Sequence, residues 1–182
     1  MKGRSVRSAA ARSRFAPVTL MLAMVLWPAL AGQEILVISS VGSVISRDAV
    51  RPGETFKAAV ILEIKKGYHI NDSAPLDEFL YPTSLAFEGS AGIEVLEVVY
   101  PAGRRAKYDY SDVEVAVYEG RVVLGALLKA AEGLTPGTVK LEGTLSYQAC
   151  DDATCLPPAE IGFELVVPIA PASRKTVELH PE

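Results

Sequence analysis

The sequence predicts an all-β protein with an immunoglobulin-like antiparallel β-sandwich. Apolar and polar residues alternate with a period of two over residues 56–64 and again over 139–147, which is the pattern of a half-buried strand. Other short apolar segments are separated by Gly and Pro, and no window keeps an apolar pattern of helical period. Short strands at this spacing are typical of a sandwich. The expected strands are 35–39, 44–46, 56–64, 68–71, 84–87, 93–100, 113–118, 121–128, 139–147 and 161–167.

The first 31 residues resemble a targeting segment, and we expect them to be a signal peptide. Five basic residues and no acid precede an apolar run from Phe15 to Leu30, and Ala29-Leu30-Ala31 has the small-x-small form of a cleavage site. We therefore expect an exported protein of a Gram-negative bacterium, located in the periplasm, without a membrane span in the mature chain. Residues 32–170 would form the domain and residues 171–182 a flexible C-terminal tail.

The charge of the mature chain argues against nucleic acid as a partner. Without the signal peptide, 13 basic residues stand against 22 acidic ones, a formal charge of −9. Such a chain offers no basic patch to a phosphate backbone. No phosphate-binding glycine loop, paired-histidine metal motif or dinucleotide fingerprint is present, so we expect no cofactor and no metal. We expect a monomer.

Both cysteines lie in one segment, where a predicted strand runs directly into Cys150 and Cys155 follows after a loop of four residues. Pro157 and Pro158 come next and end strand pairing, because proline has no backbone N–H to donate. The pair therefore lies on a tight connection between two strands, where functional residues are often found. Export favours persistence of a disulfide.

Three chemistries are open to such a pair: a structural staple, a soft-metal site for an ion such as Cu(I), or cycling between dithiol and disulfide. A staple over about six residues would contribute only about 2 kcal/mol in the chain-entropy treatment, so an ordinary sandwich would not depend on it. Structural zinc needs four ligands, and the sequence holds only two Cys and two His. Spacing alone leaves the structural staple open.

The residues around the cysteines resemble those of a known family. Tyr-Gln-Ala-Cys, a short acidic loop and Cys-Leu-Pro-Pro, over residues 147–158, are similar to the active-site segment of the N-terminal periplasmic domain of the thiol:disulfide interchange protein DsbD. Looser similarity at 67–71, 81–85, 108–111 and 117–120 extends the resemblance over roughly residues 34–169. This chain has one residue fewer between its cysteines than the best-known relatives, and Tyr110 stands where they have a cap phenylalanine.

The resemblance implies a thiol–disulfide oxidoreductase of the protein-disulfide reductase type. Cys150 and Cys155 would relay reducing equivalents from a membrane-embedded thiol reductase to thioredoxin-like periplasmic proteins, and the resemblance favours Cys155 as the attacking residue. Because the chain stops after one domain, we expect the reductase to be a separate polypeptide. The residues expected around the pair are Tyr108, Asp109 and Tyr110 in the cap, Tyr68, and Tyr147 in the core with its hydroxyl near the site.

An alternative from another class is an exported immunoglobulin-like binding module whose Cys150–Cys155 bond only braces a loop. A Cys-His hydrolase would need His69 beside a cysteine, and nothing in the sequence marks such a pairing. We therefore interpret His69 as a hydrogen-bonded structural residue. Gln148 would lie on the face opposite to the apolar residues of the preceding strand, and it is a weaker candidate for the site.

Overall fold

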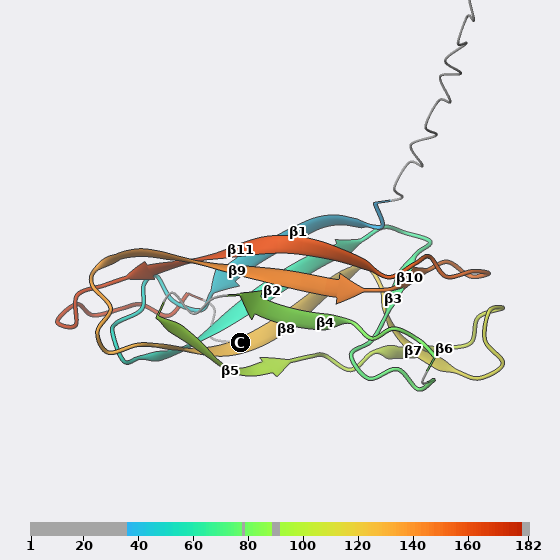
Figure 1. Ribbon diagram of the computed structural model, residues 1–182, viewed down its shortest axis with the longest axis horizontal. Helices are drawn as coiled ribbons and strands as arrows, with labels where there is room; N and C mark the ends of the chain where they lie inside the picture. Colours follow the sequence, from blue (N-terminus) through green and yellow to red (C-terminus); the bar gives the residue numbers. More distant parts are fainter. Residues whose placement is uncertain (1–35, 78, 89–91, 180–182) are drawn as a thin grey trace, which may run out of the picture. The chain divides into compact units, whose positions relative to one another are not determined.

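The alternating segments of the sequence form two antiparallel sheets that face each other. A computed structural model describes residues 36–77, 79–88 and 92–179. The larger sheet has the order β1-β2-β8-β5 and the other the order β11-β9-β4, and Figure 1 shows them stacked. The strands of the larger sheet are β1 (Ile38–Ile45), β2 (Thr55–Ile64), β8 (Arg121–Ala130) and β5 (Ile93–Val99). Those of the smaller sheet are β11 (Ala159–Ile169), β9 (Gly137–Tyr147) and β4 (Ser84–Glu88). The prediction of an all-β, immunoglobulin-like sandwich is confirmed.

Four very short strands gather at one end of the sandwich, on the right in Figure 1. Their order is β10-β3-β7-β6, and every pairing in this small sheet is antiparallel. They are β10 (Ala149–Cys150), β3 (His69–Asn71), β7 (Val115–Tyr118) and β6 (Arg104–Ala106). The small sheet contains Cys150.

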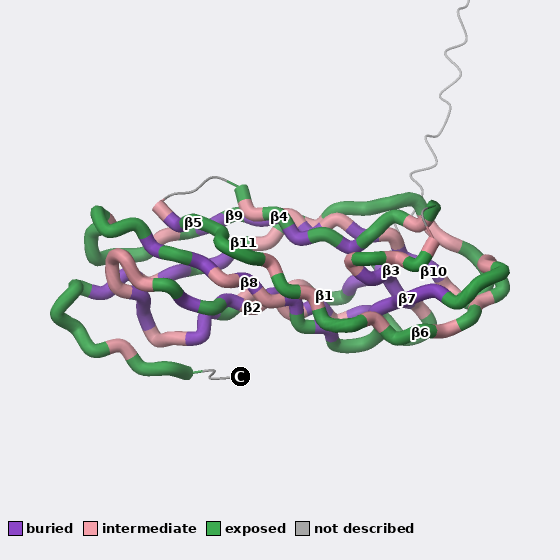
Figure 2. Tube along the Cα trace, turned by 90° about the horizontal axis from the view of Figure 1, so that it is seen from below, coloured by how far each residue is buried: buried purple, intermediate pink, exposed green. Residues whose placement is uncertain are grey.

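The core lies between the two large sheets, and the buried residues follow the predicted alternation. Alternate residues are buried in β2 and along the second half of β9, as predicted. Strand β8 has the same burial pattern although its sequence does not alternate, and Leu62, Leu124 and Leu128 are fully enclosed. One cluster of core residues extends to the small sheet and includes Ile70, Tyr118 and Ala149, whereas a second cluster fills the opposite half. Figure 2 shows this buried interior running between exposed loops. The strand that leads into the cysteines is therefore fixed by packing on its apolar face.

Two local features differ from the expected strands. Segments 35–39 and 44–46 were expected as separate pieces, but β1 runs through the polar residues between them because its backbone pairs with β2 from Ile38 to Ile45, with a register shift after Ile38. Strand β6 was not expected, because its sequence Arg-Arg-Ala has no apolar alternation and it forms only by pairing with β7 at the edge of the small sheet.

The proposed domain boundaries, after residues 31 and 170, stay predictions. The predicted signal peptide, residues 1–31, lies outside the described residues. At the other end, Arg174 forms an ion pair with Asp48, with 2.7 Å between Nη2 and Oδ2, and the N–H of Leu179 donates to the carbonyl of Ser46. The tail boundary after residue 170 stays a prediction. No helix among the described residues is long and apolar enough to cross a membrane.

Candidate active site at the end of the sandwich

Cys150 and Cys155 are joined by a disulfide, with 2.06 Å between the sulfurs and 4.0 Å between the Cα atoms. The two cysteines also face each other as an isolated antiparallel bridge, so the bond closes a four-residue loop that the backbone already folds back on itself. Cys150 is completely buried, whereas Cys155 is partly exposed to solvent. Cys155 is therefore the more accessible of the two cysteines.

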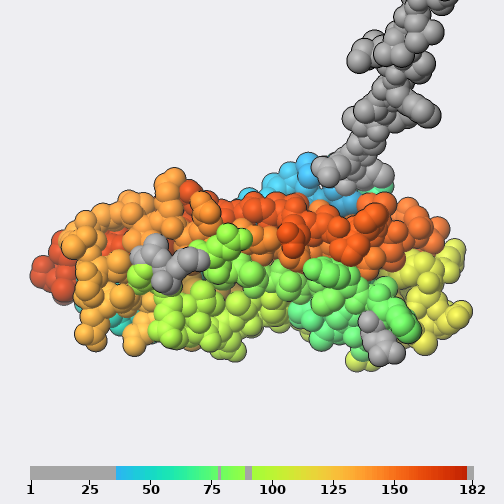
Figure 3. Space-filling model, viewed as in Figure 1, coloured from blue at the N-terminus to red at the C-terminus, as the bar shows by residue number. Residues whose placement is uncertain are grey.

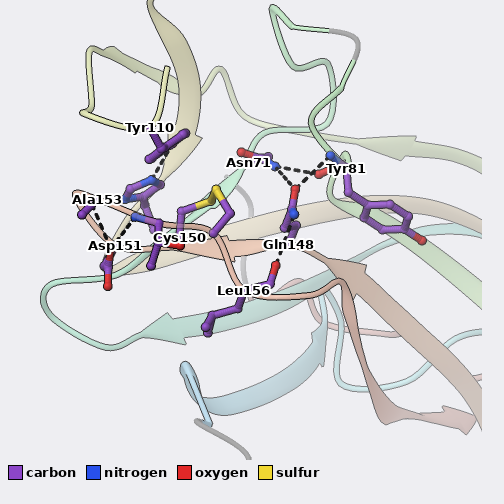
Figure 4. Close-up of a disulfide and its surroundings, with 11 residues drawn as sticks. Asn71, Tyr81, Tyr110, Gln148, Cys150, Asp151, Ala153 and Leu156 are labelled. Carbon is purple, nitrogen blue, oxygen red and sulfur yellow. Dashed lines mark hydrogen bonds between the residues drawn. A yellow bond between two sulfur atoms is a disulfide. The ribbon is translucent and has the colours of Figure 1, made fainter. Parts of the chain in front are cut away.

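Asp151 shapes the loop between the cysteines. Its carboxylate Oδ1 accepts hydrogen bonds from the N–H groups of Ala153 at 2.9 Å and Thr154 at 2.8 Å, as Figure 4 shows for Ala153. These two backbone donors hold the pKa of Asp151 below its usual range. The N–H of Asp151 donates to the carbonyl of Thr154, and the N–H of Leu156 donates to that of Ala149. The loop thus has its own hydrogen bonds in addition to the disulfide.

Gln148 is the single residue between β9 and β10, where the chain passes from one sheet to another. Its Oε1 accepts hydrogen bonds from Asn71 Nδ2 at 3.2 Å and from the N–H of Tyr81 at 3.1 Å, and its Nε2 donates to the carbonyl of Leu156 at 3.2 Å. Figure 4 shows this group of contacts beside the disulfide. Gln148 therefore ties the start of the cysteine loop, its end and the segment after β3 together.

His69 lies directly opposite Cys150 in the pairing of β3 with β10. The exposed fraction of its side chain is only 2%. The ring stacks on that of Tyr108, with 4.0 Å between centroids, and Nε2 forms a 2.8 Å hydrogen bond with the hydroxyl of Tyr110. Removal of the ring from water lowers the pKa of His69, so the imidazole is neutral at pH 7.

The segment of residues 107–112, called the cap here, covers this end of the small sheet. The N–H of Asp109 donates to the carbonyl of Asp152 at 3.0 Å, which joins the cap to the cysteine loop. Figure 3 shows the two segments, yellow and orange-red, meeting at the same end. The rings of Tyr108 and Tyr110 are parallel, with 5.5 Å between their centroids. Burial raises the pKa of Tyr110 to about 12, so its hydroxyl keeps its proton.

The cap is also anchored on its outer side. The hydroxyl of Tyr108 donates to Glu119 Oε1 at 2.8 Å and accepts from Arg104 Nη2 at 3.0 Å. Arg104 forms an ion pair with Glu119, and this hydrogen-bonded pairing keeps the pKa of Glu119 below its usual range. Glu119 occupies the two-residue connection between β7 and β8, where Gly120 has the positive φ of 62° that a tight turn requires.

The structure brings together five of the seven residues expected at the site: both cysteines, Tyr108, Asp109 and Tyr110. Tyr68 and Tyr147 pack with the core cluster that contains Ile70. Arg104 and Glu119 were not among the expected site residues, and Gln148 was only a weaker candidate. His69, which was expected as a hydrogen-bonded structural residue, and Asn71 also lie here. For Gln148 the signal was its place in the Tyr-Gln-Ala-Cys motif, whereas nothing in the local sequence indicates that β3 lies beside β10.

The sequence matches a known protein family over more than half of its length. A family model described as "Thiol:disulfide interchange protein DsbD, N-terminal" matches residues 41–166. The fold and the cysteine pair define a thiol–disulfide exchange domain on an immunoglobulin-like sandwich. The chain belongs to the family of DsbD N-terminal domains. No curated protein sequence matches the chain significantly.

Several solved structures are similar in fold. The reduced DsbD N-terminal domain of Neisseria meningitidis has a TM-score of 0.43 and 15% identity, over 78% of this chain and 90% of that one. The N-terminal periplasmic domain of ScsB from Proteus mirabilis has a TM-score of 0.47 and 12% identity, over 69% of this chain and 44% of that one. The complex between the DsbD and PilB N-terminal domains from N. meningitidis has a TM-score of 0.41 and 17% identity, over 67% of this chain and 80% of that one.

Proposed function

We propose that this domain relays reducing equivalents in the periplasm through Cys150 and Cys155, from a membrane-embedded thiol reductase to thioredoxin-like proteins. The observation that carries the proposal is the asymmetry of the pair, with Cys155 partly exposed at the end of the sandwich and Cys150 buried behind it. Membership of the DsbD N-terminal family supports the same chemistry. The periplasmic location rests on the predicted signal peptide, residues 1–31.

The exchange proceeds in two displacements. In the dithiol form, the Cys155 thiolate attacks the disulfide of the oxidised partner, and the first partner sulfur leaves with the electron pair and becomes a thiol. Cys150 then attacks the Cys155 sulfur, which forms the intramolecular disulfide and releases the second partner sulfur as a thiolate. The domain loses two electrons and the partner gains two. Recharging by the reductase runs the same steps in reverse.

The cap gives the relay selectivity. Tyr110 is held by His69 and Asp109 by Asp152, so a partner has to replace these contacts before it reaches the sulfurs. Small disulfides offer no surface with which to replace them. We therefore propose that Tyr108, Asp109 and Tyr110 form the part of the site that opens when a partner docks.

Single-cysteine variants test the relay. Reduced Cys150→Ser protein, mixed with an oxidised thioredoxin-like protein, should accumulate a mixed disulfide on a non-reducing gel, because no resolving thiol remains. Cys155→Ser should trap much less, because its remaining cysteine is buried. The double variant is the matched control and should trap nothing. Absence of a mixed disulfide with both single variants, together with no exchange by the wild type, would refute the relay.

Two further measurements address the cap and the rival interpretation. Tyr110→Ala should raise the rate of reaction with a small disulfide such as oxidised glutathione, while exchange with the protein partner changes less. A Cys150–Cys155 bond that merely braces a binding module should have a reduction potential below about −300 mV, whereas a relay disulfide should be more oxidising. The hydrogen bonds that already hold the loop give a brace little to add.

A further inference from the structure

His69 and Cys150 are cross-strand neighbours in a site from which water is excluded. Their backbones are directly opposite in the β3–β10 pairing, and side chains in this relation lie on the same face with Cβ atoms about 4.5–5.5 Å apart. Both residues are buried, with exposed fractions of 2% and 0%. The imidazole is therefore a titratable group within side-chain reach of the buried cysteine.

The proposed relay makes a specific demand at Cys150. To resolve the mixed disulfide, its thiol must lose a proton, and on recharging it leaves as a thiolate that must regain one. Burial disfavours the thiolate, and solvent cannot take the proton from a residue with no exposed surface. The acids nearest in sequence, Asp151 and Asp152, are anionic and disfavour the thiolate further. A neutral base beside Cys150 would meet the demand.

We propose that His69 is the proton acceptor and donor of Cys150, and that the hydroxyl of Tyr110 restrains it while the cap is closed. In the resolving step, the Cys150 proton moves to a ring nitrogen of His69. The Cys150 sulfur bonds to the Cys155 sulfur, and the Cys155–partner bond breaks with its electron pair on the partner sulfur. The imidazolium then loses its proton to solvent through the opened cap. The inference rests on the proposed relay and adds the group that moves its proton.

The surroundings of His69 suit this role. Burial keeps the imidazole neutral and able to accept a proton, and the adjacent acids stabilise the imidazolium once it forms. The titratable and charged groups around the ring are Cys150 on β10, Tyr108 and Tyr110 in the cap, Arg104 on β6, Glu119 after β7, and Asp151 and Asp152 in the cysteine loop. Among the electrostatic influences on the ring, Glu119 and Asp152 favour its charged form most strongly.

The hydrogen bond to Tyr110 links proton transfer to docking. Because Tyr110 keeps its proton, its hydroxyl donates to Nε2 whenever that nitrogen is unprotonated. The donated hydrogen bond favours neutral His69 and occupies one of its two nitrogens. When a partner displaces the cap, Nε2 becomes free and the basicity of the ring rises. The closed cap would thus weaken the effect of His69 on the Cys150 proton, and docking of a partner would strengthen it.

A thiolate titration of Cys155→Ser protein tests the inference without any redox partner. The pKa of the remaining thiol is followed by thiolate absorbance in Cys155→Ser and in Cys155→Ser/His69→Gln. Glutamine can still accept a hydrogen bond from Tyr110 but does not take up a proton. We expect the acid dissociation constant of Cys150 to fall about tenfold or more in the His69→Gln background, because a thiol paired with imidazole ionises at lower pH.

Tyr110→Phe in the Cys155→Ser background is the matched control. It removes the restraining hydroxyl but keeps His69, so the Cys150 dissociation constant should rise. An NMR titration of the His69 ring in Cys155→Ser needs no substitution at His69 and should show an inflection at the pH where the thiolate appears. Equal Cys150 dissociation constants with and without the His69→Gln substitution, or no shared inflection, would overturn the inference. Mixed-disulfide trapping decides the relay separately, because the titration involves no partner.

Discussion

Gln148→Ala is the most informative perturbation of the framework that holds the cysteine loop. The side chain makes three hydrogen bonds, with Asn71 Nδ2, the N–H of Tyr81 and the carbonyl of Leu156. A typical intramolecular hydrogen bond contributes about 0.5–1.5 kcal/mol net. Water can replace the partner of the exposed Tyr81 N–H, and Asn71 Nδ2 keeps a 2.9 Å bond to the carbonyl of Tyr81. We therefore expect a loss of about 1–2 kcal/mol in the free energy of unfolding.

Urea and thermal unfolding of the oxidised protein measure this loss, which corresponds to a decrease of roughly 3–6 °C in Tm for a domain of this size. Ser146→Ala, two residues earlier near the end of β9, is the matched control, because among the described residues its side chain makes one exposed hydrogen bond, to Glu160. It should change stability by less than about 0.5 kcal/mol. Gln148→Glu keeps the acceptor oxygens but loses the N–H donor to the carbonyl of Leu156. Its loss of stability should lie between those of Gln148→Ala and Ser146→Ala. If Gln148→Ala is no more destabilising than Ser146→Ala, the bridging role of Gln148 is wrong.

Three further predictions concern the bond, the histidine and processing. Reducing the disulfide should lower the free energy of unfolding by about 2 kcal/mol and leave a cooperative thermal transition, because the closed loop is short. Unfolding at 25 °C on reduction would favour the structural brace. Folding lowers the pKa of His69, so below about pH 6.5 the unfolded chain binds more protons than the folded one. The free energy of unfolding should therefore fall as the pH drops from about 6.5 towards the pKa of the folded state. Urea unfolding of His69→Gln at the same pH values should show no such dependence on pH. Mass spectrometry of the exported protein should find an N-terminus near Gly32, and an intact Met1 would contradict the predicted signal peptide.

The strand framework and the position of the cysteines could be predicted from local sequence patterns. Alternation over residues 56–64 and 139–147 indicates burial on one face, and this is a local property that persists in β2 and β9. The cysteine spacing and the two prolines fixed a tight loop before β11 in the same way. These features could be predicted because a strand with one buried face needs alternation, whatever its neighbours are.

The surroundings of the disulfide depend on the three-dimensional fold. Strand β3 is three residues long, and its pairing with β10 and β7 depends on contacts between segments far apart in the chain. That pairing places His69 opposite Cys150 and brings Asn71 to Gln148, while Tyr68 packs towards the core. The alternation of residues along one strand cannot show the contact between Asn71 and Gln148, because Gln148 lies where the chain passes from one sheet to another. Side-chain neighbours across a sheet are set by register, and register is a property of the fold as a whole.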